Sequence, residues 1–219
     1  MTSTRPVLAL LAGLAACAPR EAAVTRVAAP LAEPARIAVL PFLAGGELDR
    51  DGRFVPREPV EGDAEALGVL FQNRLGAALA RTGATVIDPD ATAAAAELAA
   101  LDGSDPQRAA QIGRRVGANV VVIGALSRWV ERVGTTWAIE SPASVAYQAA
   151  LVRTADGAVV LLDRFDYTQR ALMENLLELP RFLQARGRWL TRDEIAEGAL
   201  ASSAARIAGL LGVRRAAAP

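Results

Sequence analysis

An apolar run from Val7 to Ala16 follows a short N-terminal segment whose only charged side chain is that of Arg5. A charged start, an apolar stretch of about 7–15 residues and small residues before a cleavage site are typical of a secretory signal peptide. A membrane-spanning helix needs about 20 apolar residues, so this run is too short to be one. We therefore expect residues 1–16 to be a signal peptide and the rest of the chain to fold outside the cytoplasm.

The run ends at Cys17, the only cysteine of the chain, directly after Leu14, Ala15 and Ala16. This sequence resembles the lipobox of bacterial lipoproteins. The resemblance implies that a signal peptidase recognises Leu14, Ala15 and Ala16, and that Cys17 carries a diacylglycerol and a fatty acyl chain such as palmitate, which together anchor a protein stably. The next residue is Ala18 and not Asp, which by the sorting pattern of enterobacterial lipoproteins implies the periplasmic face of the outer membrane over the inner membrane. The alternatives are an ordinary signal peptide with an incidental cysteine, or a buried N-terminal helix.

The chain has no histidine, and all its basic residues are arginine. Histidine is the commonest general base and metal ligand, and a serine–lysine pair needs lysine. If Cys17 is acylated, no thiol is left for catalysis, metal binding or a disulfide. The formal net charge of +0 gives no electrostatic reason to expect nucleic acid as a partner. We therefore expect no enzyme, no metal and no cofactor other than the acyl chains.

The remaining length suits one domain with appendages. Residues 17–34 contain three prolines and are expected to form a lipidated, flexible tether. Residues 35–168 carry the strand and helix patterns of one α/β domain, and residues 169–215 are expected to form a C-terminal helical extension.

The domain begins with a strand–helix–strand pattern. A buried strand at 36–42 precedes a long loop at 43–62, which is rich in glycine and proline. Asp63 is placed to cap a helix at 64–81 with one apolar face, and Thr82-Gly83 ends it. A short strand at 84–88 follows and should run parallel to the first.

Two helices and three strands complete the pattern. We expect Asp90 to cap a helix at 91–101, and Ser104 or Asp105 to cap another that runs to residue 115. The apolar run 118–126 is the clearest buried strand. Strands at 143–153 and 159–167 flank an Asp-Gly turn, so the last three strands should form an antiparallel meander. Near the C-terminus, Thr191 and Glu194 have the spacing of a capping box.

These patterns predict an α/β (α+β) fold. It has a mixed sheet of about five strands, helices on one face and a C-terminal helical segment. The order resembles an envelope α/β domain that recurs in the curli-secretion lipoprotein CsgG, the N-terminal domain of TolB and the penicillin-binding-protein activator LpoB. The residues that carry the resemblance lie at 36–42, 63–81, 86–88, 117–124 and 152–157.

The resemblance to CsgG raises the alternative of an oligomeric secretion or transport component. Members of that group insert amphipathic hairpins into the outer membrane. A transmembrane strand needs about 9–11 residues with an apolar lipid face. Here the only long hairpin, 143–168, is needed for the domain's own sheet, and its outward face carries Arg153, Arg164 and either Asp163 or Asp166, depending on register.

Acidic side chains occur in pairs that could in principle serve acid–base chemistry. Each pair lies in a loop or at a helix start, where carboxylates cap backbone amides, so we expect a structural role. The pairs are Asp49/Asp51, Asp88/Asp90, Asp102/Asp105 and Asp193/Glu194. The glycines lack the Lys-Ser/Thr sequence of a phosphate-binding loop.

Aromatic residues with nearby arginines are the better functional candidates, because tryptophan and arginine dominate the energetic centres of protein interfaces. The alternative is that each tryptophan only buries area in the core or at its rim. The candidates for partner binding are Trp129, Trp137, Phe182, Arg186, Arg188 and Trp189.

The sequence therefore predicts an outer-membrane lipoprotein that binds envelope proteins of unknown identity as an assembly factor. Two alternatives stay open: the CsgG-like component, which would be a homo-oligomer, and a module that binds glycan or peptidoglycan through tryptophan and arginine.

Overall fold

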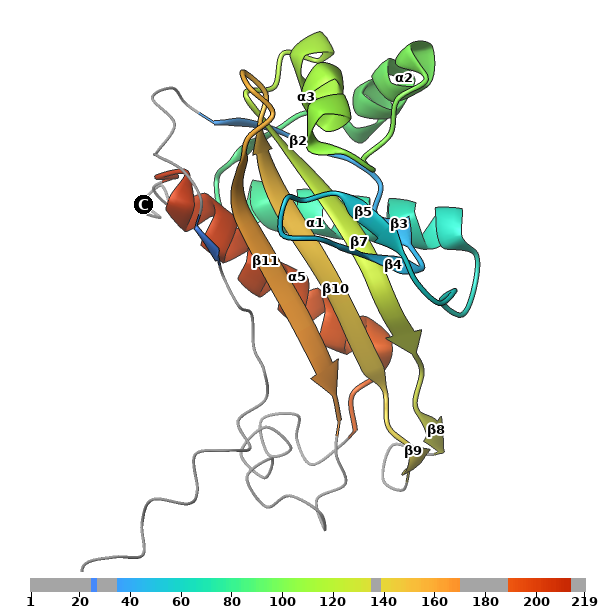
Figure 1. Cartoon of the computed structure of the whole chain (residues 1–219). Coiled ribbons are helices and arrows are strands. Elements are labelled where there is room, and N and C mark those ends of the chain that lie inside the picture. The colour runs from blue at the N-terminus through green and yellow to red at the C-terminus, as the bar shows by residue number, and fades with distance from the viewer. Residues whose placement is uncertain (1–24, 27–34, 135–138, 170–188, 214–219) are drawn as a thin grey trace, which may run out of the picture.

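The computed structural model describes residues 25–26, 35–134, 139–169 and 189–213 (Figure 1). Seven strands form its main sheet: β1 (Thr25–Arg26), β2 (Arg36–Val39), β3 (Leu43–Ala44), β6 (Thr85–Val86), β7 (Val120–Val130), β10 (Ser144–Arg153) and β11 (Val159–Thr168). Four helices are described: α1 (Ala64–Arg81), α2 (Pro89–Ala99), α3 (Pro106–Arg115) and α5 (Arg192–Leu210). The spatial order is β1, β11, β10, β7, β2 and β6, with β3 beside β7.

The sheet is mixed, which confirms the predicted fold class. Strand β2 runs parallel to β6 and β7, while β7, β10 and β11 form the predicted antiparallel meander. The turn before β11 is made possible by Gly157, whose φ of +71° is in the left-handed region. Strands β1 and β3 have two residues each and were not predicted, whereas the equally short β6 was predicted as part of the longer run 84–88.

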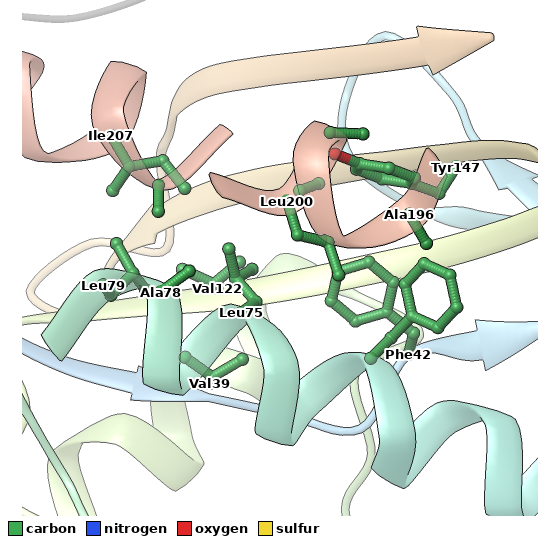
Figure 2. Close-up of a cluster of buried hydrophobic side chains, with 14 of the residues drawn as sticks. Val39, Phe42, Leu75, Ala78, Leu79, Val122, Tyr147, Ala196, Leu200 and Ile207 are labelled. Carbon is green, nitrogen blue, oxygen red and sulfur yellow. The ribbon is translucent and has the colours of Figure 1, made fainter. Parts of the chain in front are cut away.

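Helices cover both faces of the sheet, so the prediction of helices on one face was wrong in this detail. Helices α1 and α5 pack on one face, over alternate residues such as Val120 and Val122. Figure 2 shows side chains of α1 and α5, among them Leu75 and Leu200, turned toward Val122. Helix α3 packs on the other face, over Val121 and Ile123. The strands at the centre are therefore apolar on both faces, and the nearly continuous apolar run at 118–126 is the sequence signal of this.

Side-chain caps set the starts of the helices. Asp63 caps α1 and Thr191 makes a capping box with Glu194 at α5, both as predicted; of the two candidates for α3, Asp105 is the cap. Helix α2 differs, because its cap is Asp88 and not Asp90. The reason is Pro89, which occupies the first helical position and favours an extended backbone in the residue before it.

The predicted loop at 43–62 holds more structure than expected. Besides β3 it contains a hairpin of β4 (Gly46–Leu48) and β5 (Phe54–Pro56). Leu48 is 1% exposed and belongs to the core on the α3 side of the sheet. Between β7 and β10 in the chain, β8 (Val133–Gly134) pairs with β9 (Ile139–Ser141).

Gly124 in β7 leaves room for the ring of Phe42. A Cβ atom at residue 124 would lie 2.4 Å from three atoms of this ring. The ring has little space to move, since it packs against Phe71 and Tyr147 at centroid distances of 5.5 and 6.2 Å. We expect Gly124→Ala to lower the free energy of unfolding by about 1–3 kcal/mol, the usual cost of overpacking. Urea unfolding of the full chain measures it.

The matched control is Gly198→Ala in α5. Residue 198 is exposed, and a Cβ there meets no atom within 4 Å. Alanine is the better helix former, so this variant should be as stable as the wild type or more stable by up to about 1 kcal/mol. Equal effects of the two substitutions would contradict the packing argument.

Candidate functional site

One end of the main sheet gathers the described residues that flank the predicted partner-binding side chains. Trp129 is close to the end of β7, Ser144 begins β10, Thr168 ends β11 and Arg192 begins α5. Val145 lies opposite both Trp129 and Tyr167, which fixes these strand ends side by side. We call this region, defined by Trp129, Ser144, Thr168 and Arg192, the Trp129 end; the arrowheads of β7 and β11 in Figure 1 point to it.

Trp129 is mainly a core residue. It is 3% exposed, and its ring meets that of Phe71 edge-on at a centroid distance of 5.4 Å. The guanidinium carbon of Arg192 lies 4.9 Å from the Trp129 ring centroid, in cation–π range. Arg192 Nε also lies 3.7 Å from a carboxylate oxygen of Glu131. A partner at this corner would therefore contact Arg192 and Glu131, and the Trp129 ring would hold Arg192 in place from the core side.

Trp189 is buried as well, at 9% exposed. Beside it, the side-chain amide of Gln169 can pair with the backbone of Leu190: its nitrogen donates to the carbonyl at 3.0 Å, and its oxygen accepts from the N–H at 2.9 Å. The Gln169 backbone N–H donates to the Ala143 carbonyl at 3.1 Å. The chain thus leaves the sheet after Gln169 and returns at Trp189 in the same place.

The other predicted site residues lie outside the described residues. These are the lipidation and cleavage residues Leu14, Ala15, Ala16 and Cys17, and the partner-binding candidates Trp137, Phe182, Arg186 and Arg188. Their roles stay predictions.

The face of the Trp129 end that points away from α5 is polar. Arg128 donates to the Ser144 hydroxyl and forms an ion pair with Asp166. The hydroxyls of Ser144 and Thr168 lie 2.7 Å apart. These side chains come from three neighbouring strands. They include one cation, one anion and two hydroxyls, so they can both donate and accept hydrogen bonds. The hydroxyls thus have each other and Arg128 as hydrogen-bond partners, and a hydroxyl without a neighbouring base is a weak nucleophile.

A buried polar network joins the sheet to α5, and sequence reasoning missed it. Asp163 is 0% exposed and accepts two hydrogen bonds from Arg206, at 3.0 and 2.8 Å. Arg206 also donates to Ser203 at 3.1 Å, and the Ser203 and Tyr147 hydroxyls are 2.7 Å apart. Of the two acidic residues considered for the outward face, the structure thus places Asp163 inward. The sequence did hold one signal for this network: Ser203 lies three residues before Arg206 and four before the apolar Ile207, so all three share one face of the helix.

The paired carboxylates act in turns, caps and ion pairs. Asp49 accepts from two backbone N–H groups in the β4–β5 hairpin, and Asp102 accepts from the Ser104 N–H. Asp193 pairs with Arg74 at 2.6 Å. Within the described ranges, no three His, Cys, Asp or Glu side chains are grouped closely enough to hold a metal ion. No helix of the described part is both long and apolar enough to cross a membrane.

Alkaline pH should destabilise the domain through Tyr147. Burial, together with the charge of Asp163, raises the pKa of the Tyr147 hydroxyl well above its ordinary value, although its bond to Ser203 acts in the opposite direction. The unfolded chain releases this proton near pH 10 while the folded chain keeps it, so stability is fully present below about pH 10 and falls above it. The limiting slope is about 1.4 kcal/mol per pH unit.

The absence of lysine makes this effect measurable, because the side chains that titrate between pH 8 and about 11.5 are then Cys17 and the two tyrosines. The measurement is the free energy of unfolding across that range for the wild type and for Tyr147→Phe. The variant should lose most of the decline. An equally steep decline in Tyr147→Phe would show that another group is responsible.

No protein-family model matches this sequence, and no curated protein matches it in sequence. Several solved structures have a backbone course similar to that of this chain. PelC from Paraburkholderia phytofirmans, solved as a dodecamer, is 16% identical, with 88% of this chain and 99% of that chain covered and a TM-score of 0.49. Lipoprotein GNA1162 from Neisseria meningitidis is 14% identical, with 70% and 97% covered and a TM-score of 0.42. The C-terminal domain of LpoB from Salmonella enterica is 17% identical, with 62% and 84% covered and a TM-score of 0.37.

Proposed function

We propose that this chain is a lipid-anchored protein of the bacterial envelope, held on the periplasmic face of the outer membrane, whose α/β domain binds partner proteins and is not an enzyme. The observation that carries the proposal is the sequence from Val7 to Cys17: an apolar run too short to span a membrane, small residues, and the single cysteine of the chain. An acyl anchor on Cys17 would leave the domain itself free to face other envelope components.

The contacts of the described polar residues support a binding role. The carboxylates of residues 49, 63, 88, 102 and 105 accept hydrogen bonds from backbone N–H groups, and the Asp163 carboxylate accepts hydrogen bonds from Arg206. A catalytic group is instead held ready beside a reacting atom with a suitable base or acid. The side chains that remain accessible at the Trp129 end, Arg128 and Arg192 among them, are suited to recognition of polar protein surfaces.

The anchor is tested by feeding cells an alkyne-bearing fatty acid and detecting the label on the purified chain. The wild type should be labelled and should fractionate with the outer membrane, and Cys17→Ala should be unlabelled. A matched control restores a thiol outside the recognition sequence: Cys17→Ala with Ala22→Cys should also stay unlabelled. Label on Cys17→Ala, or an unlabelled wild type, would contradict the proposal.

Partner binding is tested by cross-linking in intact cells. Arg128→Glu should abolish the protein adducts made by the wild type, because it reverses a charge at the polar face of the Trp129 end. Glu97→Arg, an exposed charge reversal on α2, is the control and should keep the adducts. Ring-shaped particles in detergent would favour the CsgG-like alternative, and saturable binding of purified peptidoglycan would favour the glycan-binding module.

A further inference from the structure

Three arginines at or beside the Trp129 end carry buried side-chain nitrogens for which the described residues provide no hydrogen-bond partner. These atoms are Nη1 of Arg74, Nε of Arg192, and both Nε and Nη1 of Arg132. Buried polar atoms in native proteins nearly always have a partner, and an atom that lacks one destabilises the folded state. Such atoms therefore indicate where a ligand or a binding partner supplies the missing acceptor.

Contacts along the start of α5 join these arginines into one cluster. Arg74 pairs with Asp193 at 2.6 Å. Arg192, the residue before Asp193, has its Nε 3.7 Å from a carboxylate oxygen of Glu131 and its guanidinium over the Trp129 ring. Figure 1 shows the first turn of α5 beside the end of β7, in agreement with these contacts. The cluster therefore lies on the side of the sheet that α5 covers.

Arg132 differs from the other two arginines, because among the described residues no carboxylate pairs with its side chain. Its neighbour Glu131 is already engaged: one carboxylate oxygen accepts the Arg132 backbone N–H at 2.8 Å, and the other faces Arg192. The Asp193 carboxylate accepts a hydrogen bond from Arg74. The Arg132 guanidinium is thus the one positive charge of this cluster that the described part of the chain leaves unbalanced.

Arg132 lies close to the surface. The residue is half-buried, and the two residues that follow it, Val133 and Gly134, are exposed. A half-buried guanidinium is partly shielded from water, so a hydrogen bond from it to an anion is stronger than one made in open solvent. A partner that approaches past residues 133 and 134 can reach this side chain.

We propose that Arg132 is the centre of a binding site for a carboxylate group on an acidic segment of a partner protein. The inference rests on the proposed binding role of the Trp129 end and names the chemistry that the partner brings there. The two oxygens of a carboxylate match the parallel N–H groups of a guanidinium. Glu131 and Asp193 already place two negative charges in the cluster, so a singly charged carboxylate is repelled less than a phosphate, which carries nearly two charges.

The direction of a stability change tests the site without any partner. Arg132→Met removes the unsatisfied donors and keeps a long side chain. In urea unfolding of the purified full chain in a non-ionic detergent, it should raise the equilibrium constant for folding about fivefold or more. Arg115→Met, at an exposed position of α3, is the control and should change it by less than about twofold. An unchanged or lowered constant for Arg132→Met would overturn the proposal, because the guanidinium would then have its acceptor within the chain.

A defined acidic probe tests the ligand class. Fluorescein-labelled hexaglutamate should bind the full chain saturably in fluorescence anisotropy at low salt, and labelled hexaglutamine should not bind. Arg132→Met should weaken hexaglutamate binding at least about tenfold, and Arg115→Met should leave it unchanged. Absence of saturable binding, or equal binding by Arg132→Met, would overturn the proposal. Displacement of the peptide by inorganic phosphate at concentrations at which acetate has no effect would show that the ligand class is wrong.

Cross-linking in intact cells separates this site from the proposed function. Arg132→Met should lose the protein adducts that the wild type makes. If Arg128→Glu loses these adducts and Arg132→Met keeps them, partner binding stands and the carboxylate site is wrong. If the wild type makes no adducts, the proposed partner binding fails, and the urea and peptide measurements still decide whether Arg132 binds a carboxylate.

Discussion

Replacing Phe71 by alanine is expected to lower the free energy of unfolding by about 3–5 kcal/mol, the usual cost of deleting a buried phenylalanine ring. Phe71 is 0% exposed and lies on α1 at the centre of the core shared with α5. Its ring contacts those of Phe42, Trp129 and Tyr147 at centroid distances of 5.5, 5.4 and 5.7 Å. These three residues come from different segments of the chain, so the cavity would loosen all of them together.

Urea unfolding of the full chain, followed by tryptophan fluorescence, measures this effect. Trp129 stands directly against Phe71, so its emission reports the packing of the altered site. The matched control is Val69→Ala on the same helix, where the side chain is 41% exposed and the expected change is within about 0.5 kcal/mol. A loss below about 1 kcal/mol for Phe71→Ala would mean that the core does not depend on this ring.

Local signals in the sequence predicted most of the elements. Helix α1 was predicted from Asp63 to Thr82-Gly83, because the cap, the apolar period and the final glycine agree, and the structure has these boundaries. The antiparallel pairing of β10 and β11 followed from alternation on both sides of an Asp-Gly turn. The cap of α2 shows the limit of this approach: Asp90 was predicted, but Pro89 takes the first helical position and Asp88 before it is the cap.

Features that depend on contacts distant in sequence were not predictable in this way. Shifting β11 by one residue relative to β10 would exchange the faces of Asp163 and Arg164. The strand patterns left this register open, so they did not show which of the two side chains points inward. The inward position of Asp163 depends on Arg206, 43 residues later. Trp129 was chosen for its residue type, but its burial depends on Phe71, which lies 58 residues earlier in the chain.

Arg206→Ala should lower the free energy of unfolding by about 3 kcal/mol, the lower end of the cost of removing one partner from a buried ion pair. The substitution leaves the Asp163 carboxylate, which is 0% exposed, without the two hydrogen bonds that Arg206 donates to it. Arg206 itself is 30% exposed, so water can enter part of the vacated space and reduce the loss.

A double substitution separates the uncompensated charge from lost packing. Replacing both partners, Asp163→Leu with Arg206→Met, leaves no buried charge and should cost less than Arg206→Ala alone, because buried ion pairs are often exchanged for apolar residues at little cost. Glu197→Ala, at an exposed position of α5, is the matched control and should change stability by no more than about 0.5 kcal/mol. If the double variant were the less stable one, the pair would itself be stabilising α5 on the sheet, and the argument from an unpaired charge would be wrong.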